Sequence, residues 1–230
     1  HTRSAHVSWA RWTALILVAL TMFFGYMFVD VLSPLQNMLE STRGWSPTIF
    51  GLYGGSEFIL NVCGFLLVAG IILDKMGVRF TGILSASLMV LGAGIKFYGL
   101  SNYFYEGGFG YEFLNSFLTD IPASAKLACL GFMIFGCGTE MAGITVSKAI
   151  VKWFTGKEMA LAMGLEMAIA RLGVFAVFSL SPWVAELGSP SVVRPVAVVG
   201  VLLCIGLLTF LVFTVMDRKL DRQTGAAVAA

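Results

Sequence analysis

The sequence contains little charge and almost no histidine. Only 12% of its 230 residues are Asp, Glu, Lys or Arg, against roughly 25% in a typical soluble domain. The two histidines are His1 and His6, so no His-based catalytic or metal-binding constellation is available to the rest of the chain. Apolar residues make up 58% of the chain and the mean hydropathy is +0.87. We therefore predict an all-α membrane protein that is not an enzyme and needs no cofactor or metal.

The cysteines and the net charge argue against a disulfide-linked or metal-binding protein and against a nucleic-acid-binding protein. The four cysteines all fall inside apolar runs, which favours buried thiols over a disulfide framework or a metal site; they are Cys63, Cys129, Cys137 and Cys204. A formal net charge of +2 is too small to indicate a nucleic-acid partner.

Six apolar segments are long enough to cross a bilayer, which takes roughly 20 residues of helix. We place them at about 12–38, 47–73, 80–99, 123–150, 158–183 and 192–216. Segment 1–11 would precede the bundle and segment 217–230 would begin a cytoplasmic linker. The loop at 101–122 is acidic and aromatic, and is either a lid over the outer mouth or an ordinary interfacial loop.

Basic residues gather on one side of this arrangement, which predicts that both termini are cytoplasmic. The cytoplasmic side receives Arg3, Arg11, Lys75, Arg79, Lys148, Lys152, Lys157, Arg218, Lys219 and Arg222. The other side receives Arg43, Lys126 and Arg194.

Five ionisable residues lie deep in the predicted spans: Asp30, Glu57, Glu140, Glu166 and Arg171. A charge at the bilayer centre costs at least ~2.5–3.5 kcal/mol, so these side chains must face a wet cavity or one another. They occupy the first, second, fourth and fifth spans. The third span has only Lys96, expected to extend to water at the outer end, and the sixth has no deep charge. Such a pattern fits a 3+3 inverted repeat whose third helices face lipid.

Glu140 and Arg171 have comparable depth, near the bilayer midplane, counted at ~1.5 Å per residue. One interpretation is an internal ion pair that fixes helix packing. The other is a clamp in which Glu140 takes an ammonium and Arg171 holds a carboxylate of the solute. Glu166, five residues before Arg171, is expected to point away from it. Glu57 and Glu166 are candidate proton sites, and Asp30, just before Pro34, marks a local break or a gate contact.

A charged turn with two glycines joins the second and third spans. Gly70, Asp74, Lys75, Gly77 and Arg79 follow the pattern G-x-x-x-D-[RK]-x-G-x-[RK]. This turn predicts a tight cytoplasmic hairpin whose acid can receive a neighbouring helix N-terminus and basic side chains. The pattern resembles the loop between helices two and three of the major facilitator superfamily.

A second block supports the resemblance. It runs from Phe135-Gly136-Cys137-Gly138-Thr139-Glu140 through Trp153-Phe154-Thr155-Gly156-Lys157-Glu158 to Ala170-Arg171-Leu172-Gly173. It is similar to the branch that contains a lysosomal dipeptide transporter. The resemblance implies half of a twelve-helix fold, a missing C-terminal six-helix half, and a carrier that recognises the two ends of a short peptide through Glu140 and Arg171.

Three functions remain open on this sequence. The first is alternating-access transport of a short peptide, and the second is proton-coupled transport of an organic anion or sugar acid through Glu57 or Glu166. The third is a non-transporting receptor or accessory subunit built on the same fold. A plasma (inner) membrane and a lysosomal-type membrane are both compatible with the pattern.

Overall fold

Long apolar helices make up nearly all of the chain. The structure, a computed structural model, describes residues 2–156 and 158–229, with side chains from residue 9 to residue 223 except residue 157. Lys157 and the Arg3 side chain, both counted among the predicted cytoplasmic cations, lie outside this part. Five described stretches are long and apolar enough to cross a membrane: Trp9–Arg43, Pro47–Leu100, Ala123–Trp153, Met159–Glu186 and Val193–Gln223.

The first stretch is a broken helix. It consists of α1 (Thr2–Val29), the 3-10 turn η1 (Ser33–Leu35) and α2 (Gln36–Arg43). The break falls at Pro34, because proline has no N–H to donate and its ring clashes with the carbonyl four residues back. The carbonyl of Val31 accepts instead from the Ser181 hydroxyl of a neighbouring helix. A local break next to Asp30, one of the two readings of that residue, is thus observed.

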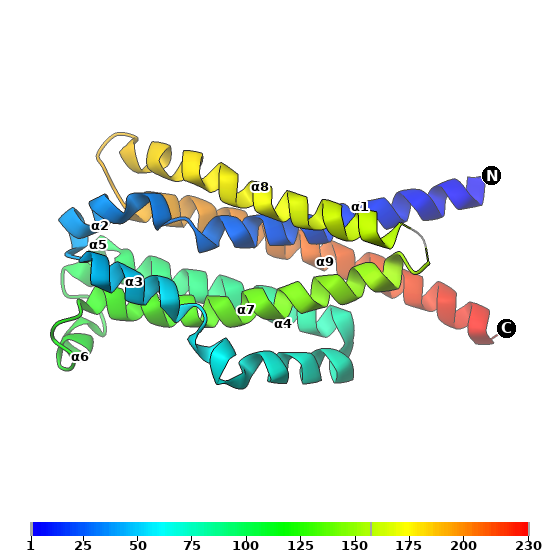
Figure 1. Cartoon of the computed structure of the whole chain (residues 1–230), viewed down its shortest axis with the longest axis horizontal. Helices are drawn as coiled ribbons and strands as arrows, with labels where there is room; N and C mark the ends of the chain where they lie inside the picture. The colour runs from blue at the N-terminus through cyan, green and yellow to red at the C-terminus, as the bar shows by residue number, and fades with distance from the viewer. Residues whose placement is uncertain (1, 157, 230) are drawn as a thin grey trace.

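The second stretch turns back on itself. Its 54 residues contain α3 (Pro47–Ser56), the π-helical turn η2 (Asn61–Phe65) and α4 (Leu66–Leu100). A straight helix of this length would span ~80 Å, far more than the ~30 Å hydrocarbon core. Gly77 adopts φ 84° and ψ 175°, a conformation that glycine enters readily, and the ribbon reverses there (Figure 1). The hairpin predicted between Gly70 and Arg79 is therefore present.

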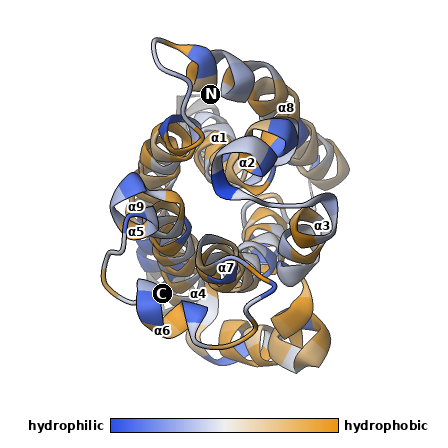
Figure 2. Cartoon of the chain, turned by 90° about the vertical axis from the view of Figure 1, so that its left-hand side faces the viewer, coloured by the Kyte–Doolittle hydropathy of each residue, from blue (hydrophilic) through white to orange (hydrophobic). Residues whose placement is uncertain are grey.

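The remaining helices follow in two groups. Two short helices, α5 (Asn102–Tyr105) and α6 (Tyr111–Asn115), precede three long ones, α7 (Ala123–Trp153), α8 (Met159–Glu186) and α9 (Val193–Ala229). α1 packs chiefly against α8 and α9, whereas α7 packs against α3 and α4. Seen end-on, the long helices surround the axis of the bundle (Figure 2).

Both chain termini lie at one end of the bundle, which we call the terminal end (Figure 1). The reversal at Gly77 lies at the same end. The sixth predicted span was expected to stop at residue 216, but α9 continues to Ala229. The continuation contains Lys, Leu, Arg, Gln and Ala, which favour helix even where no bilayer requires it.

The 101–122 loop lies beside α4 and not across the bundle axis (Figure 2). The Phe104 side chain is buried, and the Tyr98 hydroxyl of α4 donates to the Phe109 carbonyl at 2.8 Å. The Phe109 and Phe113 side chains in this loop remain largely exposed. The arrangement favours the interfacial alternative over a lid.

Candidate solute site and its charged surroundings

A cleft of about 260 Å³ opens between α1, α7 and α8. It is lined by Met22, Tyr26, Gly143, Ser147, Met163, Glu166, Met167, Ala170 and Arg171. Arg171 is exposed, and its guanidinium carbon lies 5.3 Å from the centre of the Tyr26 ring. A cation over an aromatic face is attracted by the ring quadrupole, so Tyr26 orients Arg171 toward the cleft.

Glu166 lies in the same cleft as Arg171. The two side chains line one cleft although they point in different directions from α8, as their spacing in the sequence predicts. Five residues on a helix separate two side chains by about 140°, and a cleft formed by three helices is wide enough to include both. Glu166 is 8% exposed, so it borders the cleft from a buried position.

Glu140 and Arg171 form no ion pair. No contact within 4.0 Å joins their charged atoms in the described residues. They are held apart because α8 packs mainly on α1 and only slightly on α7. Both charges nevertheless lie within electrostatic range of the Tyr26 hydroxyl. Tyr26 and Arg171 line the cleft together, whereas Glu140 is not among the residues that line it.

Tyr26 was missed by sequence reasoning. The available signal was its position four residues before Asp30, which places the two on one face of α1. Aromatic residues are too common in membrane spans for that spacing to single it out.

Glu57 packs directly on α7 at a glycine. A Cβ at Gly136 would lie 2.1 Å from the Glu57 carbonyl oxygen, so only glycine permits this approach. Asn61 Nδ2 donates to the Gly136 carbonyl at 3.3 Å, and Glu140 follows Gly136 by about one turn. The Phe-Gly-x-Gly-x-Glu block thus brings Glu57, which is 7% exposed, within electrostatic range of Glu140.

Lys96 does not extend to water, contrary to the prediction. Its side chain is fully buried at 0% exposure. The Nζ atom lies 4.4 Å, 5.0 Å and 4.8 Å from the ring centres of Phe28, Tyr53 and Phe132. The span-counting argument failed because it treated the third span as lipid-facing, whereas α4 packs closely against α7.

Asp30 has a local structural role in the α1 break. Its Oδ1 accepts a hydrogen bond from the Ser33 hydroxyl at 3.1 Å, and its carbonyl accepts from the Ser33 N–H at 3.1 Å. These bonds satisfy the turn that Pro34 imposes. Asp30 also lies within electrostatic range of Glu57 and Lys96.

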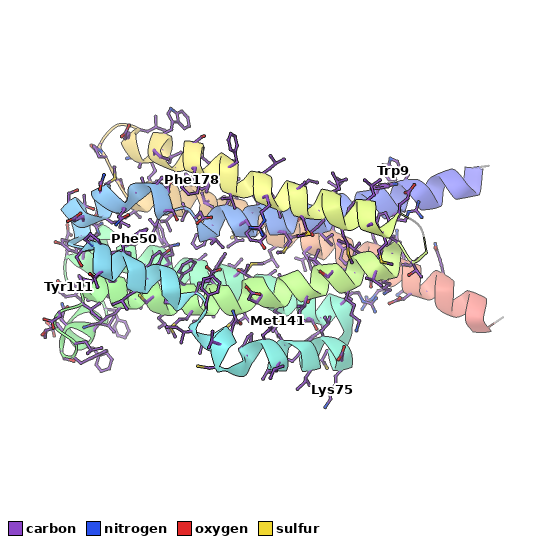
Figure 3. The ribbon with its side chains drawn as sticks, in the orientation of Figure 1. Trp9, Phe50, Lys75, Tyr111, Met141 and Phe178 are labelled. Atoms are coloured by element: carbon purple, nitrogen blue, oxygen red, sulfur yellow. The ribbon has the colours of Figure 1, made fainter. Side chains whose placement is uncertain are left out.

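The hairpin places Asp74 and Lys75 at the surface, whereas Arg79 pairs with acidic residues of α9. Asp74 lies 3.6 Å from Lys148 of α7, and both side chains are largely exposed. Lys75 points away from the bundle (Figure 3), and Gly70 has open space around its Cα. Arg79 instead reaches α9, where Nη1 bonds to Asp217 at 2.8 Å and to Asp221.

Arg79 belongs to an ionic network that we call the terminal cluster: Arg79, Lys152, Trp153, Asp217 and Asp221. Asp217 is fully buried and also accepts from Lys152 Nζ and Trp153 Nε1, each at 2.9 Å. Burial opposes ionisation of Asp221, but Lys152 and Arg79 together hold the pKa of its carboxyl below its usual range. The cluster joins α4, α7 and α9 at the terminal end, and sequence analysis had placed Asp217 in a linker.

Two of the four cysteines are exposed, contrary to the expectation of buried thiols. Cys63 and Cys204 are exposed in this chain, Cys129 is half-buried and Cys137 is buried. An apolar run in the sequence shows that a cysteine lies in a membrane-type helix. It does not show whether the thiol faces the inside of the bundle or an outer face that lipid or another bundle covers.

Comparison with known proteins agrees with this architecture. A sequence model of the Major Facilitator Superfamily matches residues 15–229. The lysosomal dipeptide transporter MFSD1 of Homo sapiens is 25% identical over 234 residues, covering 96% of this chain and 44% of that protein. The same-named protein of Mus musculus is 31% identical over 101 residues, covering 40% of this chain and 22% of that protein. The chain thus spans less than half the length of these relatives.

Proposed function

Because the chain belongs to the Major Facilitator Superfamily, we propose that it is the N-terminal half of a solute carrier that works by alternating access. In this proposal the reversal at Gly77 divides the second apolar stretch into two crossings, which gives six in all. Both termini face the cytoplasm, as the distribution of Lys and Arg favours. A second six-helix bundle completes the carrier, in keeping with the 44% of the human relative that the chain covers.

The packing pattern supports a 3+3 inverted repeat. A pseudo-two-fold axis relates the two units of such a repeat, so equivalent helices of the two units should make equivalent contacts. α1 packs on α8 and α9, and α7 packs on α3 and α4. The contacts of α1 in the first unit thus correspond to the contacts of α7 in the second unit. In this correspondence the part of α4 after Gly77 is the third crossing.

The proposed solute is a short peptide. Arg171 would hold its carboxylate, because a guanidinium binds carboxylates through two parallel hydrogen bonds. Glu140 would take the amino-terminal ammonium. The cleft of about 260 Å³ is small for a ligand site, and the partner bundle would form its other wall. The similarity to lysosomal dipeptide transporters favours a dipeptide.

One observation carries this proposal: Arg171 is exposed to the cleft, with no acidic partner within 4.0 Å in the described residues. A charge at membrane depth is retained where it meets water, a counter-charge or a ligand. Here the protein leaves the guanidinium free to bind an anionic group.

Counterflow of a labelled dipeptide by the full-length protein in liposomes tests the proposal. Arg171→Ala should abolish exchange, and Arg171→Lys should retain little of it because the bidentate geometry is lost. Arg222→Ala is the matched control, because Arg222 is exposed near the end of α9. Undiminished exchange by Arg171→Ala would contradict the proposal that Arg171 binds the peptide carboxylate.

The second candidate is a proton-coupled carrier for an organic anion or sugar acid, using Glu57 or Glu166. The observation in its favour is that buried Glu166 shares the cleft with Arg171. Thermal stabilisation by organic acids but not by dipeptides would favour it. A non-transporting receptor or accessory subunit would give no counterflow with any solute.

The exposed hairpin acid is the proposed cytoplasmic latch. Asp74 would exchange its contact with Lys148 for partners in the second bundle when the cytoplasmic side closes, with Lys75 and Arg79 beside it. The glycine at 77 allows the tight reversal, and Gly70 provides a smooth face next to it.

A further inference from the structure

A groove of about 410 Å³ opens between α4 and α9 at the terminal end. Arg79 lines it from α4, and Arg218, Lys219 and Arg222 line it from α9, whereas no acid is among the lining residues. Cations that line one groove repel one another, so the groove favours an anionic ligand that neutralises them.

The acids closest to the groove are already paired. Asp217 and Asp221 form their ion pairs with Arg79 and Lys152. In the part of the chain that the structure describes, no ion pair within 4.0 Å joins an acid to the three α9 cations of the groove. Arg79 contacts its two acids through Nη1 alone, so its other guanidinium nitrogens can donate to a ligand. The groove therefore carries more positive charge than the protein itself neutralises.

The exposed face of α9 leads from apolar residues to these cations. Large exposed apolar residues recur along it at intervals of three or four: Val201, Ile205, Leu208, Val212 and Val215. The same spacing continues to exposed Lys219, so one face of the helix is apolar along the membrane part and cationic at the terminal end. The apolar part is ~21 Å long at ~1.5 Å per residue. This length suits an acyl chain of one leaflet, whose hydrocarbon is ~15 Å deep.

We propose that the groove binds the headgroup phosphate of an anionic phospholipid whose acyl chains lie along the exposed face of α9. Arg218 holds the phosphate through paired N–H donors, and Lys219 adds a point charge. Arg79 donates from α4, so a bound lipid joins α4 to α9 just after the hairpin. Ile83 and Val215 form the apolar wall of the groove.

Two features favour a lipid over a soluble phosphate. Basic residues are common beside any membrane helix on the cytoplasmic side, but here they come from two helices and line one groove, an arrangement that suits anionic headgroups. The apolar face that leads to the groove matches a phospholipid, which has its anionic and apolar parts in the same order. Neither α4 nor α9 lines the cleft at Arg171, so the lipid site is separate from the proposed solute site and does not depend on it.

Titration of the full-length protein in detergent micelles with phosphatidylglycerol tests the site, with bound lipid counted by native mass spectrometry. Phosphatidylcholine is the neutral lipid for comparison, and glycerol 3-phosphate supplies a soluble phosphate. The variant Arg218→Gln/Lys219→Gln removes two exposed cations of the groove. Lys75→Gln/Lys148→Gln is the matched control, because it removes two exposed cations near the hairpin that do not line the groove. A third variant, Arg218→Lys/Lys219→Arg, retains both charges.

We expect the wild type to bind phosphatidylglycerol in preference to phosphatidylcholine, without displacement by glycerol 3-phosphate. Arg218→Gln/Lys219→Gln should bind phosphatidylglycerol roughly 25-fold more weakly, because each basic residue near an anionic lipid surface contributes about fivefold. The control should bind as the wild type does, and Arg218→Lys/Lys219→Arg should bind nearly as well.

Equal binding of the two lipids by the wild type would overturn the inference, and so would an equal loss of binding in the control. Displacement of the lipid by glycerol 3-phosphate would show a site for soluble phosphate instead. A wild type that binds no lipid, because another segment of the full-length protein fills the groove, would also overturn it.

Discussion

The buried carboxylate of the terminal cluster gives the sharpest stability prediction. Asp217 has a side chain 1% exposed and receives donors from Arg79, Lys152 and Trp153 at 2.8–2.9 Å. Breaking a buried pair by removing one partner costs about 3–5 kcal/mol. Asp221 still pairs with both cations, so we expect Asp217→Asn to lie at the lower end, near ~3 kcal/mol. That corresponds to a Tm lowered by about 6–12 °C.

Thermal unfolding of the purified protein in detergent provides the measurement, with Asp221→Asn as the matched control. Asp221 contacts the same two cations but its side chain is 42% exposed, so its loss should cost less than ~1 kcal/mol. Equal Tm changes for the two variants, or none for Asp217→Asn, would refute the argument that burial makes Asp217 the structural centre of this cluster.

Three further predictions follow from single contacts. Gly136→Ala places a methyl group 2.1 Å from the Glu57 carbonyl oxygen and should lower stability by about 1–3 kcal/mol. Gly143→Ala meets open space and should be neutral or slightly stabilising in the same melting assay; equal effects would show that the close approach at Gly136 is unimportant. Because Lys152 and Arg79 lower the pKa of Asp221, its stabilising effect is complete above the unfolded value near ~4 and is lost as pH falls through the lower folded value. Asp221→Asn should therefore show a smaller loss of Tm on acidification than the wild type, and an identical acid profile would contradict this. Asp74 is 82% exposed, so Asp74→Asn should change the free energy of unfolding by less than ~1 kcal/mol. The same variant should slow counterflow, and a normal exchange rate would contradict the proposal that Asp74 acts as the cytoplasmic latch.

Elements with strong local signals could be predicted from the sequence. Long apolar runs gave the helices, because a bilayer requires internally bonded backbone. The reversal between Gly70 and Arg79 was predictable because the turn contains Gly77, and glycine readily takes positive φ. Proline at 34 marked the break in the first stretch for an equally local reason.

Contacts between distant segments were not predictable in the same way. Lys96 was placed at the water interface because sequence depth reveals how far a residue lies along a helix but not which neighbours surround it. The rings around Lys96 come from α1, α3 and α7, which meet only after the helices pack. Asp217 was assigned to a linker because its hydrogen-bond partners, Arg79, Lys152 and Trp153, are more than 60 residues away in sequence.

The candidate site was predicted in its residue types and not in its geometry. Glu140 and Arg171 were identified from depth, charge and resemblance, and their separation follows from α8 packing on α1 instead of α7. Tyr26 and the participation of Glu166 in the cleft depend on that packing. The roles of these residues in transport stay predictions.

Binding of end-blocked dipeptides tests the central proposal most directly. The affinity of the full-length protein is measured for a free dipeptide, its N-acetyl form and its C-terminal amide, with wild type, Glu140→Gln and Arg171→Met. We expect each blocked end to weaken wild-type binding by roughly 10–100-fold, the value of one charge-assisted interaction. Glu140→Gln should no longer discriminate against the acetylated peptide, and Arg171→Met should no longer discriminate against the amide. Wild-type binding indifferent to both blocked ends would contradict a solute site built on these two charges.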